Sequence, residues 1–555
     1  MAFSRRRMLL GGAAVLLSGT NRLLLGANRR LAPELVLHNA GVWTVDPLSP
    51  AAQAIAIADG RILAVGSNEF VLSGAVAGTR RVDVGGKRVT PGFIDAHAHP
   101  AASGLEYARS VDCGLGSIEA IKAALRRRAQ QTAPGAWIKG FNYDDGKTPR
   151  PLSLADLDEA VRDHPVAVEH RGGHSLFVNS MAMRIVGYER STPSPPHGLI
   201  EKDAGGNLTG KVADDARIPF DRLLSRKATR AEWRDAAMLI SRRATARGIT
   251  SVCDALGDVD TLQGYRDAAA AGGPPQTRTY CNIDSKSIQP FVDAGINTGF
   301  GDDSVRVGAA KFFSDGSISE RTAWISEPYV GTDFHGVPVG TREDIYRLAS
   351  KLHKAGWQLA THANGDLAID EVLGIYEQIQ RETPRRDPRY RLEHCTVVTP
   401  SLIARIKALG AIPVPFSAYV SFHGDVMHFY GEARTRHMFA MRDFLDAGIP
   451  VPDSSDFTAS PMDPPLWLQS QVTRTDPQGH VWGANQRISV AEAVRCGTIN
   501  GAYSMFEEHL KGSIQPGRLA DLVVWDRDMF EVEPSELSRI NPERTMIGGR
   551  WAYEA

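Results

Sequence analysis

Short apolar runs separated by turn residues predict β-structure at both ends of the chain. Residues 54–58 and 61–65 are two such runs, and Asp59 and Gly60 between them are typical of a hairpin turn. Residues 522–525 form a similar run near the C-terminus. Two β-rich ends around a long middle predict that both ends together build one small β-sandwich domain.

The middle of the chain follows a different pattern, in which short apolar runs alternate with helical stretches. Residues 250–252 and 358–360 are examples of the apolar runs, whereas residues 117–131 and 342–355 have the spacing of helices. This alternation favours parallel β/α units, and the length of the stretch fits a (β/α)₈ TIM barrel. The predicted fold class is α/β, with a barrel that carries an insertion and a separate β-sandwich.

These patterns divide the chain into segments. Residues from about 135 to 225 are rich in Gly, Pro and other loop residues, so we expect an insertion there that caps the barrel. The predicted segments are a leader at 1–32, the two parts of the β-sandwich at 33–89 and 506–555, and the barrel at 90–505.

The N-terminal segment has the form of an export signal. Arg5, Arg6 and Arg7 precede a short apolar stretch, and no acidic residue comes before Glu34. Adjacent arginines indicate the twin-arginine type. The stretch is shorter than the roughly 20 residues of a membrane-spanning helix, so no stable membrane anchor is expected. The sequence predicts an exported, periplasmic protein that engages the twin-arginine export machinery; a disordered basic tail is the alternative.

Composition and charge exclude several classes of protein. The chain has 555 residues, of which 43% are hydrophobic, too many for a disordered chain. Its net charge is −1, but residues 1–34 carry six Arg and one Glu, so the remainder is acidic at −6. A nucleic-acid partner is therefore not expected. Five scattered Cys give neither a disulfide framework nor a CxxC metal site.

Two histidines open the predicted barrel. His97 and His99 follow the apolar run of residues 89–94. In a strand, residues two apart point to the same face, so both imidazoles can meet one divalent metal such as zinc. The spacing alone is weak evidence, but the position at a strand end agrees with where β/α barrels hold their catalytic groups.

Further ionisable residues follow at later strand ends. Lys311 lies inside an apolar strand, where it needs either an acidic partner such as Asp315 or carboxylation of Nζ, which would make it a metal ligand. His362 and His394 end two later strands. Such a succession of sites is hard to explain by packing and predicts a metal centre.

The last carboxylate of the set has rivals. Asp456 and Asp453 both lie near the end of a strand, and the residues alone leave the choice between them open; the family resemblance given below favours Asp456, through its Ser-Asp pair. Cys395 adjoins His394 and is a weaker alternative ligand, since it points away from the site in a regular strand.

Taken together, these motifs resemble the amidohydrolase superfamily, and within it the amidohydrolase-3 type, which includes YtcJ-like and N-substituted formamide deformylase-like proteins. The resemblance rests on the following segments: residues 91–99, Lys311 with Asp315-Gly316, His362 with Gly365-Asp366, Glu393-His394, Ser455-Asp456, Gly173-His174 with Asn179-Ser180, and the closing segment 512–522. The sequence departs from the family's pattern at Asn364, Cys395-Thr396, Ser454 and Phe457-Thr458. These residues lie beside the predicted ligands, so they weaken the inference of a substrate from the family more than the inference of metal binding.

The resemblance implies a role for each residue. His97 and His99 would bind one metal, His362 and His394 a second, and carboxylated Lys311 would bridge the two. Asp456 would bind metal and act as the general base. His174 would stabilise the oxyanion or orient the substrate, with a buried structural histidine as the alternative. One or two zinc ions are expected, with iron, manganese and nickel open.

The function that follows is hydrolysis of a carbon–nitrogen bond in a non-peptide amide, N-formyl or cyclic amide substrate. The alternatives are a metal-dependent deaminase, isomerase or dehydratase on the same scaffold, and a non-catalytic exported binding protein. The substrate would be a small molecule, and the family often forms homo-oligomers. Aromatic residues in loops beyond the strands either line an apolar substrate pocket or pack the barrel: Trp324, Tyr329, Phe416, Tyr419, Phe422, His423, Phe429 and Tyr430.

Overall fold

The computed structural model describes residues 32–171, 175–196 and 198–555. Of the predicted leader at 1–32, only the last residue lies within these ranges. His174 lies outside them. Among the described residues, no helix combines the length and the apolar character that crossing a bilayer requires.

Seven parallel strands form the central sheet. In spatial order they are β20 (Ile412–Val414), β19 (Arg391–His394), β18 (Leu359–Ala363), β17 (Val305–Phe313), β16 (Arg278–Asp284), β15 (Ile249–Gly257) and β8 (Phe93–Ala98). Residues 451–455, which are not assigned to a strand, run along the eighth position of the barrel. On one side Asp456 N donates to His97 O over 2.7 Å, and on the other Ser417 N, just beyond β20, donates to Ser454 O over 2.9 Å. The predicted barrel fold is confirmed, with its last segment held by only a few hydrogen bonds.

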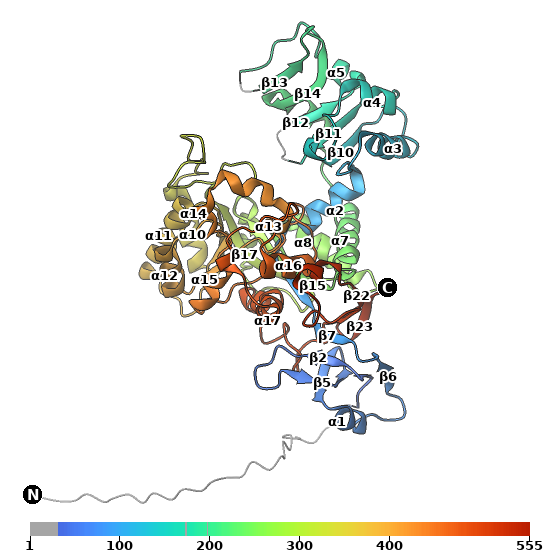
Figure 1. Ribbon diagram of the computed structural model, residues 1–555, viewed down its shortest axis with the longest axis vertical. Coiled ribbons are helices and arrows are strands. Elements are labelled where there is room, and N and C mark those ends of the chain that lie inside the picture. Colours follow the sequence, from blue (N-terminus) through green and yellow to red (C-terminus); the bar gives the residue numbers. More distant parts are fainter. Residues whose placement is uncertain (1–31, 172–174, 197) are drawn as a thin grey trace, which may run out of the picture.

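Helices cover the outside of this sheet (Figure 1). They include α7 (Arg230–Thr245), α8 (Val259–Ala270), α10 (Arg342–Lys354), α11 (Asp366–Glu382), α12 (Pro400–Leu409), α15 (Met441–Asp446), α16 (Pro464–Thr473) and α17 (Val490–Arg495). In α11 one face is buried, with Ile369, Val372 and Tyr376 among its residues, because apolar positions recur every three or four residues.

Both ends of the chain build the β-sandwich. One sheet has the order β5 (Arg61–Gly66), β4 (Ala54–Ala58), β1 (Leu35–His38), β6 (Arg80–Asp83). The other has the order β23 (Arg550–Glu554), β22 (Pro542–Ile547), β21 (Leu522–Trp525), β7 (Arg88–Pro91), β2 (Gly41–Trp43), β3 (Ala51–Ala52). Residues of both sheets, such as Ile55 and Leu522, share one buried apolar cluster. The C-terminal strand β21 lies between β22 and the N-terminal strand β7, so neither end can complete this sheet alone.

The insertion is a separate sheet that α2 (Pro100–Arg109) joins to the barrel (Figure 1). Its strands are β13 (Gly198–Lys202), β14 (Leu208–Asp214), β12 (Ser175–Val178), β11 (Val166–His170), β10 (Ile138–Tyr143) and β9 (Val111–Asp112). Helices α3 (Ile118–Ala129), α4 (Leu154–Ala160), α5 (Ser180–Val186) and α6 (Ile218–Leu224) accompany it.

This sheet starts earlier in the chain than the expected range of about 135–225. Strand β9 begins at Val111, and α3 packs in the insertion with Ile121 and Leu125 against Ile138 and Val166. The sequence pattern placed this helix among the barrel units. An amphipathic helix has the same apolar spacing whichever sheet it covers, so the pattern alone cannot assign it.

We expect Trp525→Ala to destabilise the protein by about 3–5 kcal/mol, the usual range for emptying a buried Trp site. Trp525 is fully buried, packs edge-on against Phe93 at 5.7 Å, and donates from Nε1 to Thr90 Oγ1 over 2.9 Å. It therefore joins the sandwich to the barrel. Chemical denaturation of the full chain measures the effect. Phe70→Ala is the control, because Phe70 is 62% exposed; equal losses in both variants would contradict the assignment.

Candidate metal centre

The predicted ligands meet at the carboxyl ends of the barrel strands. His97 is on β8, Lys311 on β17, His362 on β18 and His394 at the end of β19. His99 is the residue that precedes α2. This edge of a parallel barrel is where side chains from different strands converge.

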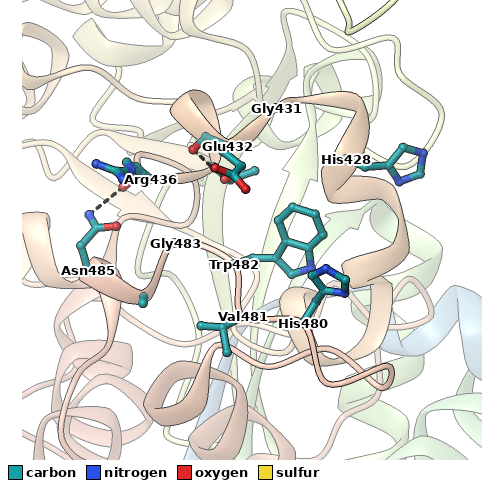
Figure 2. A pocket seen from close by; sticks show the side chains of 11 residues that line it. His428, Gly431, Glu432, Arg436, His480, Val481, Trp482, Gly483 and Asn485 are labelled. Carbon is teal, nitrogen blue, oxygen red and sulfur yellow. Dashed lines mark hydrogen bonds between the residues drawn. The ribbon is translucent and has the colours of Figure 1, made fainter.

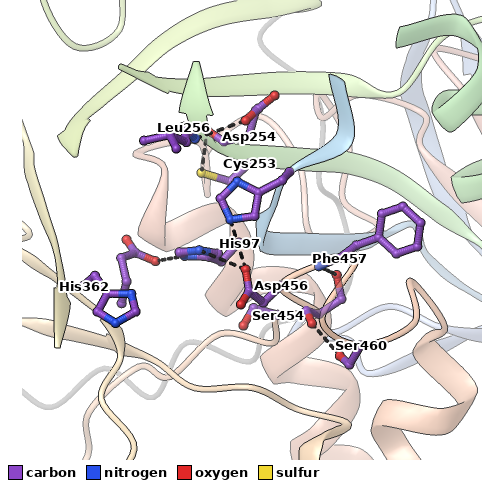
Figure 3. Close-up of polar contacts among 12 residues, drawn as sticks. His97, Cys253, Asp254, Leu256, His362, Ser454, Asp456, Phe457 and Ser460 are labelled. Carbon is purple, nitrogen blue, oxygen red and sulfur yellow. Dashed lines mark hydrogen bonds and ion pairs between the residues drawn. The ribbon is translucent and has the colours of Figure 1, made fainter. Parts of the chain in front are cut away.

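Three of these groups come together most closely. Ligand atoms of His97, His394 and Asp456 all lie within 4.8 Å of one another. Asp456 Oδ1 is 3.4 Å from His97 Nε2 and 3.1 Å from His99 Nε2. Figure 3 shows the linked His97 and Asp456, with His362 beside them. Together with His99, the cluster of His97, His394 and Asp456 combines three imidazoles with one carboxylate.

Two nitrogens in this cluster lack a hydrogen bond to the described residues. His97 Nε2 and His394 Nδ1 are buried and make no hydrogen bond with any described residue. Burial lowers the pKa of His97 to about 4 and puts the pKa of His394 well below its usual value, in each case with help from the charge of Lys311. Neutral imidazoles with free lone pairs, beside a carboxylate, are the donor set that zinc prefers, so the residues fit a divalent metal.

Backbone strain accompanies these ligands. His394 and Asp456 both adopt left-handed backbone conformations, with φ of 71° and 50°. Residues other than Gly rarely do so, and such strain gathers at functional sites. Asp456 is held in place because Ser455 N donates to Asp95 Oδ1 over 3.0 Å, which ties the closing segment to β8. Burial raises the pKa of Asp95 to about 7 despite this bond.

Asp456 and Asp453 now separate clearly. Asp453 Oδ1 accepts from Ser417 Oγ over 3.0 Å, away from the histidines, and burial raises its pKa to about 7. For Asp456, burial also raises the pKa, but the hydrogen bond from His99 and the charges of His97, His99 and Lys311 outweigh it. The pKa of Asp456 therefore lies below its usual value, and its carboxylate is ionised at neutral pH.

Lys311 is buried at this centre with only 1% of its surface exposed. Burial lowers its pKa, although the charges of Glu393 and Asp456 oppose the shift. Within the described chain it makes no ion pair, and Asp315 does not serve as its partner. Asp315 instead accepts backbone N–H groups from Trp324, Asn364 and Gly365, at 3.0, 2.9 and 2.8 Å.

These backbone contacts explain part of the motif after His362. A Cβ on Gly365 would lie 1.8 Å from Trp324 O, so no larger residue fits without a shift of the backbone. His362 Nε2 lies 3.0 Å from Gly316 O and 3.1 Å from Asn364 Nδ2. The His362 ring also contacts the His394 ring at 4.5 Å.

A buried ion pair fixes the orientation of His97. Its Nδ1 bonds to Glu393 Oε2, and Arg391 holds Glu393 through Nε to Oε1 at 2.6 Å. Arg391 Nη2 also donates to Ala96 O over 2.6 Å, and all three side chains are almost fully buried. A carboxylate that accepts from Nδ1 sets the tautomer in which Nε2 carries the lone pair. Glu393 therefore aims His97 Nε2 at the centre of the cluster.

The chain matches the amidohydrolase family over residues 80–553. The chain belongs to this family. N-substituted formamide deformylase of Arthrobacter pascens is 30% identical over 541 residues, covering 94% of this chain and 98% of that protein. Putative amidohydrolase YtcJ of Bacillus subtilis (strain 168) is 28% identical over 535 residues, covering 94% and 99%.

A solved structure shares the fold. The uncharacterized metal-dependent hydrolase from Pyrococcus horikoshii OT3 has a TM-score of 0.74 and 22% identity, covering 90% of this chain and 99% of that one. The resemblance drawn from the sequence motifs is thus confirmed. The protein is an enzyme of the metal-dependent amidohydrolases, which act on carbon–nitrogen bonds.

The structure brings together most of the residues that the sequence singled out in this amidohydrolase, and it adds supporting residues that the sequence did not indicate. His97, His99, His394 and Asp456 are brought together, with Lys311 and His362 beside them. Cys395 is buried next to His394 and is not part of the cluster. The supporting roles of Glu393, Arg391 and Asp95 were not predicted. Oppositely charged residues two apart in an apolar strand, as in Arg391 and Glu393, were the available signal.

A cavity of 380 Å³ opens beside the centre. Its lining residues are His99, Ala102, Ser103, Glu106, Phe141, Asp456, Thr458 and Ala459. None of the aromatic loop residues expected to line a pocket belongs to this set. Phe416 instead stacks on His394 at 4.3 Å, and Tyr329, Tyr419 and Tyr430 are buried in an apolar cluster with it. Their role here is packing.

A second cavity, of 590 Å³, lies among the loops that follow β20 (Figure 2). It is lined by polar and aromatic residues that include Glu432, Arg436 and Trp482. His480 stacks on Trp482 at 5.5 Å. Its lining contains no member of the histidine cluster, so the smaller cavity is the one that adjoins the chemistry.

Proposed function

We propose that this amidohydrolase cleaves the carbon–nitrogen bond of a small non-peptide amide, with N-substituted formamides as the leading substrate class. The observation that carries the proposal is the cluster of His97, His394 and Asp456, which has two buried imidazole nitrogens without a hydrogen bond to a described residue and whose Asp456 lines a cavity of 380 Å³. The similarity to the Arthrobacter pascens deformylase supports the formamide class.

The residues that would hold the metal are His97, His99, His362, His394, Asp456 and Lys311 with a carboxylated Nζ. Zinc suits this set of nitrogen and oxygen donors. When bound, a divalent metal polarises a carbonyl oxygen and lowers the pKa of a water ligand to about 7. Lys311 is suited to carboxylation because burial favours its neutral amine, which is the nucleophilic form.

Asp456 would move the proton. Its carboxylate is ionised at neutral pH and its Oδ1 faces His97 and His99, so it can accept a proton from the attacking water. It would then deliver this proton to the leaving nitrogen, since Asp456 lines the cavity that would receive the substrate. His99, bonded to Oδ1, keeps the carboxylate in position.

We expect the purified chain to hydrolyse N-benzylformamide to formate and benzylamine only when metal is bound. Dialysis against a chelator should lower the rate at least about 100-fold, and one or two equivalents of zinc should restore it, because the unpaired imidazole nitrogens need the cation. Formate release measures the reaction, with metal content determined in parallel. Full activity of the stripped protein would contradict the proposal, and release of ammonia or a product of unchanged mass would favour a deaminase or an isomerase instead.

We also propose that residues 1–32 direct export of the enzyme. Arg5, Arg6 and Arg7 ahead of the short apolar stretch support the twin-arginine route. Fractionation of cells that express the chain with Arg5–Arg7 replaced by lysine would test it. Export is expected to fail for that variant, whereas equal periplasmic levels of both chains would overturn the proposal.

A further inference from the structure

We propose that Glu106 is a substrate-binding residue that selects amides with an ammonium group, or a comparable N–H donor, at the far end of the substituent. The inference rests on the proposed amide hydrolysis at the adjoining metal centre. It follows from the extent of the 380 Å³ cavity, from the half-paired state of the Glu106 carboxylate, and from the position of Glu106 as the one charged group among the described lining residues beyond His99 and Asp456 at the metal end.

Helix α2 forms one wall of the cavity. His99 lies at its N-terminus, and Ala102, Ser103 and Glu106 follow at the spacing that places residues on one helix face. The seven steps from His99 to Glu106 rise about 10 Å along the helix. The cavity therefore runs from the metal centre to the Glu106 carboxylate.

The groups between these two ends are small or apolar. Ala102 and Ala459 line the cavity, and Phe141 on β10 reaches it from the insertion. Ser103 and Thr458 contribute hydroxyl groups. Apart from His99 and Asp456 at the metal end, Glu106 is the one charged side chain among the described lining residues. A substrate fits this lining if a hydrocarbon or aromatic group separates its amide, at the metal end, from a hydrogen-bond donor at the Glu106 end.

Glu106 is only partly satisfied by the protein. Its Oε2 pairs with Lys139 Nζ at 3.2 Å, whereas Oε1 is buried and has no hydrogen-bond partner among the described residues. Lys139 is shared with Glu169, whose Oε2 lies 3.1 Å away. The terminal torsion of a glutamate is broad, so either carboxylate oxygen can turn toward a ligand. An acceptor left without a donor favours a ligand that brings one.

Glu169 provides a matched control. It pairs with the same Lys139 and also with Arg217 at 2.9 Å, but it does not line the cavity. Replacement of Glu169 by Gln removes the same kind of charge from the same ion-pair network. A general loss of stability or of the Lys139 position would therefore affect both variants, whereas loss of a substrate contact would affect only Glu106→Gln.

The experiment compares two formamides of equal shape, N-formyl-4-(aminomethyl)benzylamine and N-formyl-4-ethylbenzylamine. The zinc-loaded full chain should show a kcat/KM at least about 10-fold higher for the ammonium compound, as expected of a hydrogen bond to a charged group. In Glu106→Gln the ratio should fall to about 1, and in Glu169→Gln it should stay as in the wild type. An equal ratio in wild type and Glu106→Gln would overturn the inference.

Binding of the product amines separates this inference from the proposed function. Calorimetry on the zinc-loaded protein, with 1,4-bis(aminomethyl)benzene and 4-ethylbenzylamine as probes, requires no turnover. A preference for the diamine that Glu106→Gln removes would support the binding site even if neither formamide is hydrolysed, in which case the proposed function fails. Hydrolysis of both formamides without any effect of Glu106→Gln on rates or binding would leave the function standing and refute the role of Glu106.

Discussion

Asp456→Asn is expected to lower kcat for amide hydrolysis by about 10³- to 10⁴-fold, the range that loss of a general base together with a carboxylate ligand can produce. The amide has nearly the shape of the carboxylate, so the loop and the bond from Asp456 N to His97 O should persist. The asparagine amide cannot accept a proton at neutral pH. The Asp456 carboxylate can, because its pKa lies below the usual carboxyl value and it is therefore ionised. Single-turnover kinetics and metal analysis distinguish a slow chemical step from loss of metal.

Asp453→Asn is the matched control for that experiment. Both carboxylates lie in the closing segment of the barrel, but Asp453 bonds to Ser417 and its pKa is raised to about 7 by burial. A neutral side chain is accommodated there, since a carboxyl with a pKa of about 7 is about half protonated at neutral pH, so the amide should change kcat by less than about 10-fold. If Asp453→Asn were the inactive variant and Asp456→Asn the active one, the assignment of the base would have to be reversed.

Glu393→Gln is expected to weaken zinc binding by about 10- to 100-fold, the cost usually seen when the partner of a metal-binding histidine is replaced. Glu393 accepts from His97 Nδ1, which keeps the lone pair of Nε2 directed at the cluster. A glutamine can present its N–H₂ group instead, and the neighbouring Arg391 then loses its anionic partner. Competition with a chromophoric chelator measures the affinity without any need for turnover.

The control for Glu393→Gln is Asp521→Asn. Asp521 also forms a buried pair with an arginine, with 2.6 Å between its Oδ2 and Arg278 Nε. Arg278 begins β16, so this pair lies at the amino ends of the barrel strands and not at the carboxyl ends, where the histidines are. Both variants should lose stability, because each leaves a buried guanidinium without its carboxylate. Only Glu393→Gln should lose zinc affinity. Equal affinities in wild type and Glu393→Gln would refute the positioning role.

The sequence predicted those parts of the site whose residues lie close together in the chain or at the ends of strands. His97 lies on β8 and His99 directly follows this strand, and His394 and Asp456 end extended segments, so local patterns sufficed. The bond between His97 and Glu393 joins residues 296 positions apart and depends on the closed barrel. No local periodicity encodes such a contact.

The same limit explains the insertion and the pocket. Helix α3 has the apolar spacing of a barrel helix, yet its partners are strands of the insertion. The aromatic loop residues were expected either to line a substrate pocket or to pack the barrel, and Phe416 packs on His394 within an apolar cluster that includes Tyr419 and Tyr430. In both cases a pattern reports that a face is buried and not what it is buried against.

Strand β7 has a consequence for how the protein is made. It pairs with β21, so Pro91 meets Leu522 and the two partners are more than 400 residues apart in the chain. At a synthesis rate of about 5–20 residues per second, the first half of this sheet must wait roughly 20–90 s on the ribosome for the second. Until then β7 presents an unpaired edge, which in nascent chains invites pairing with other strands. The β-sandwich of this enzyme therefore finishes folding only after its C-terminal strands have left the ribosome.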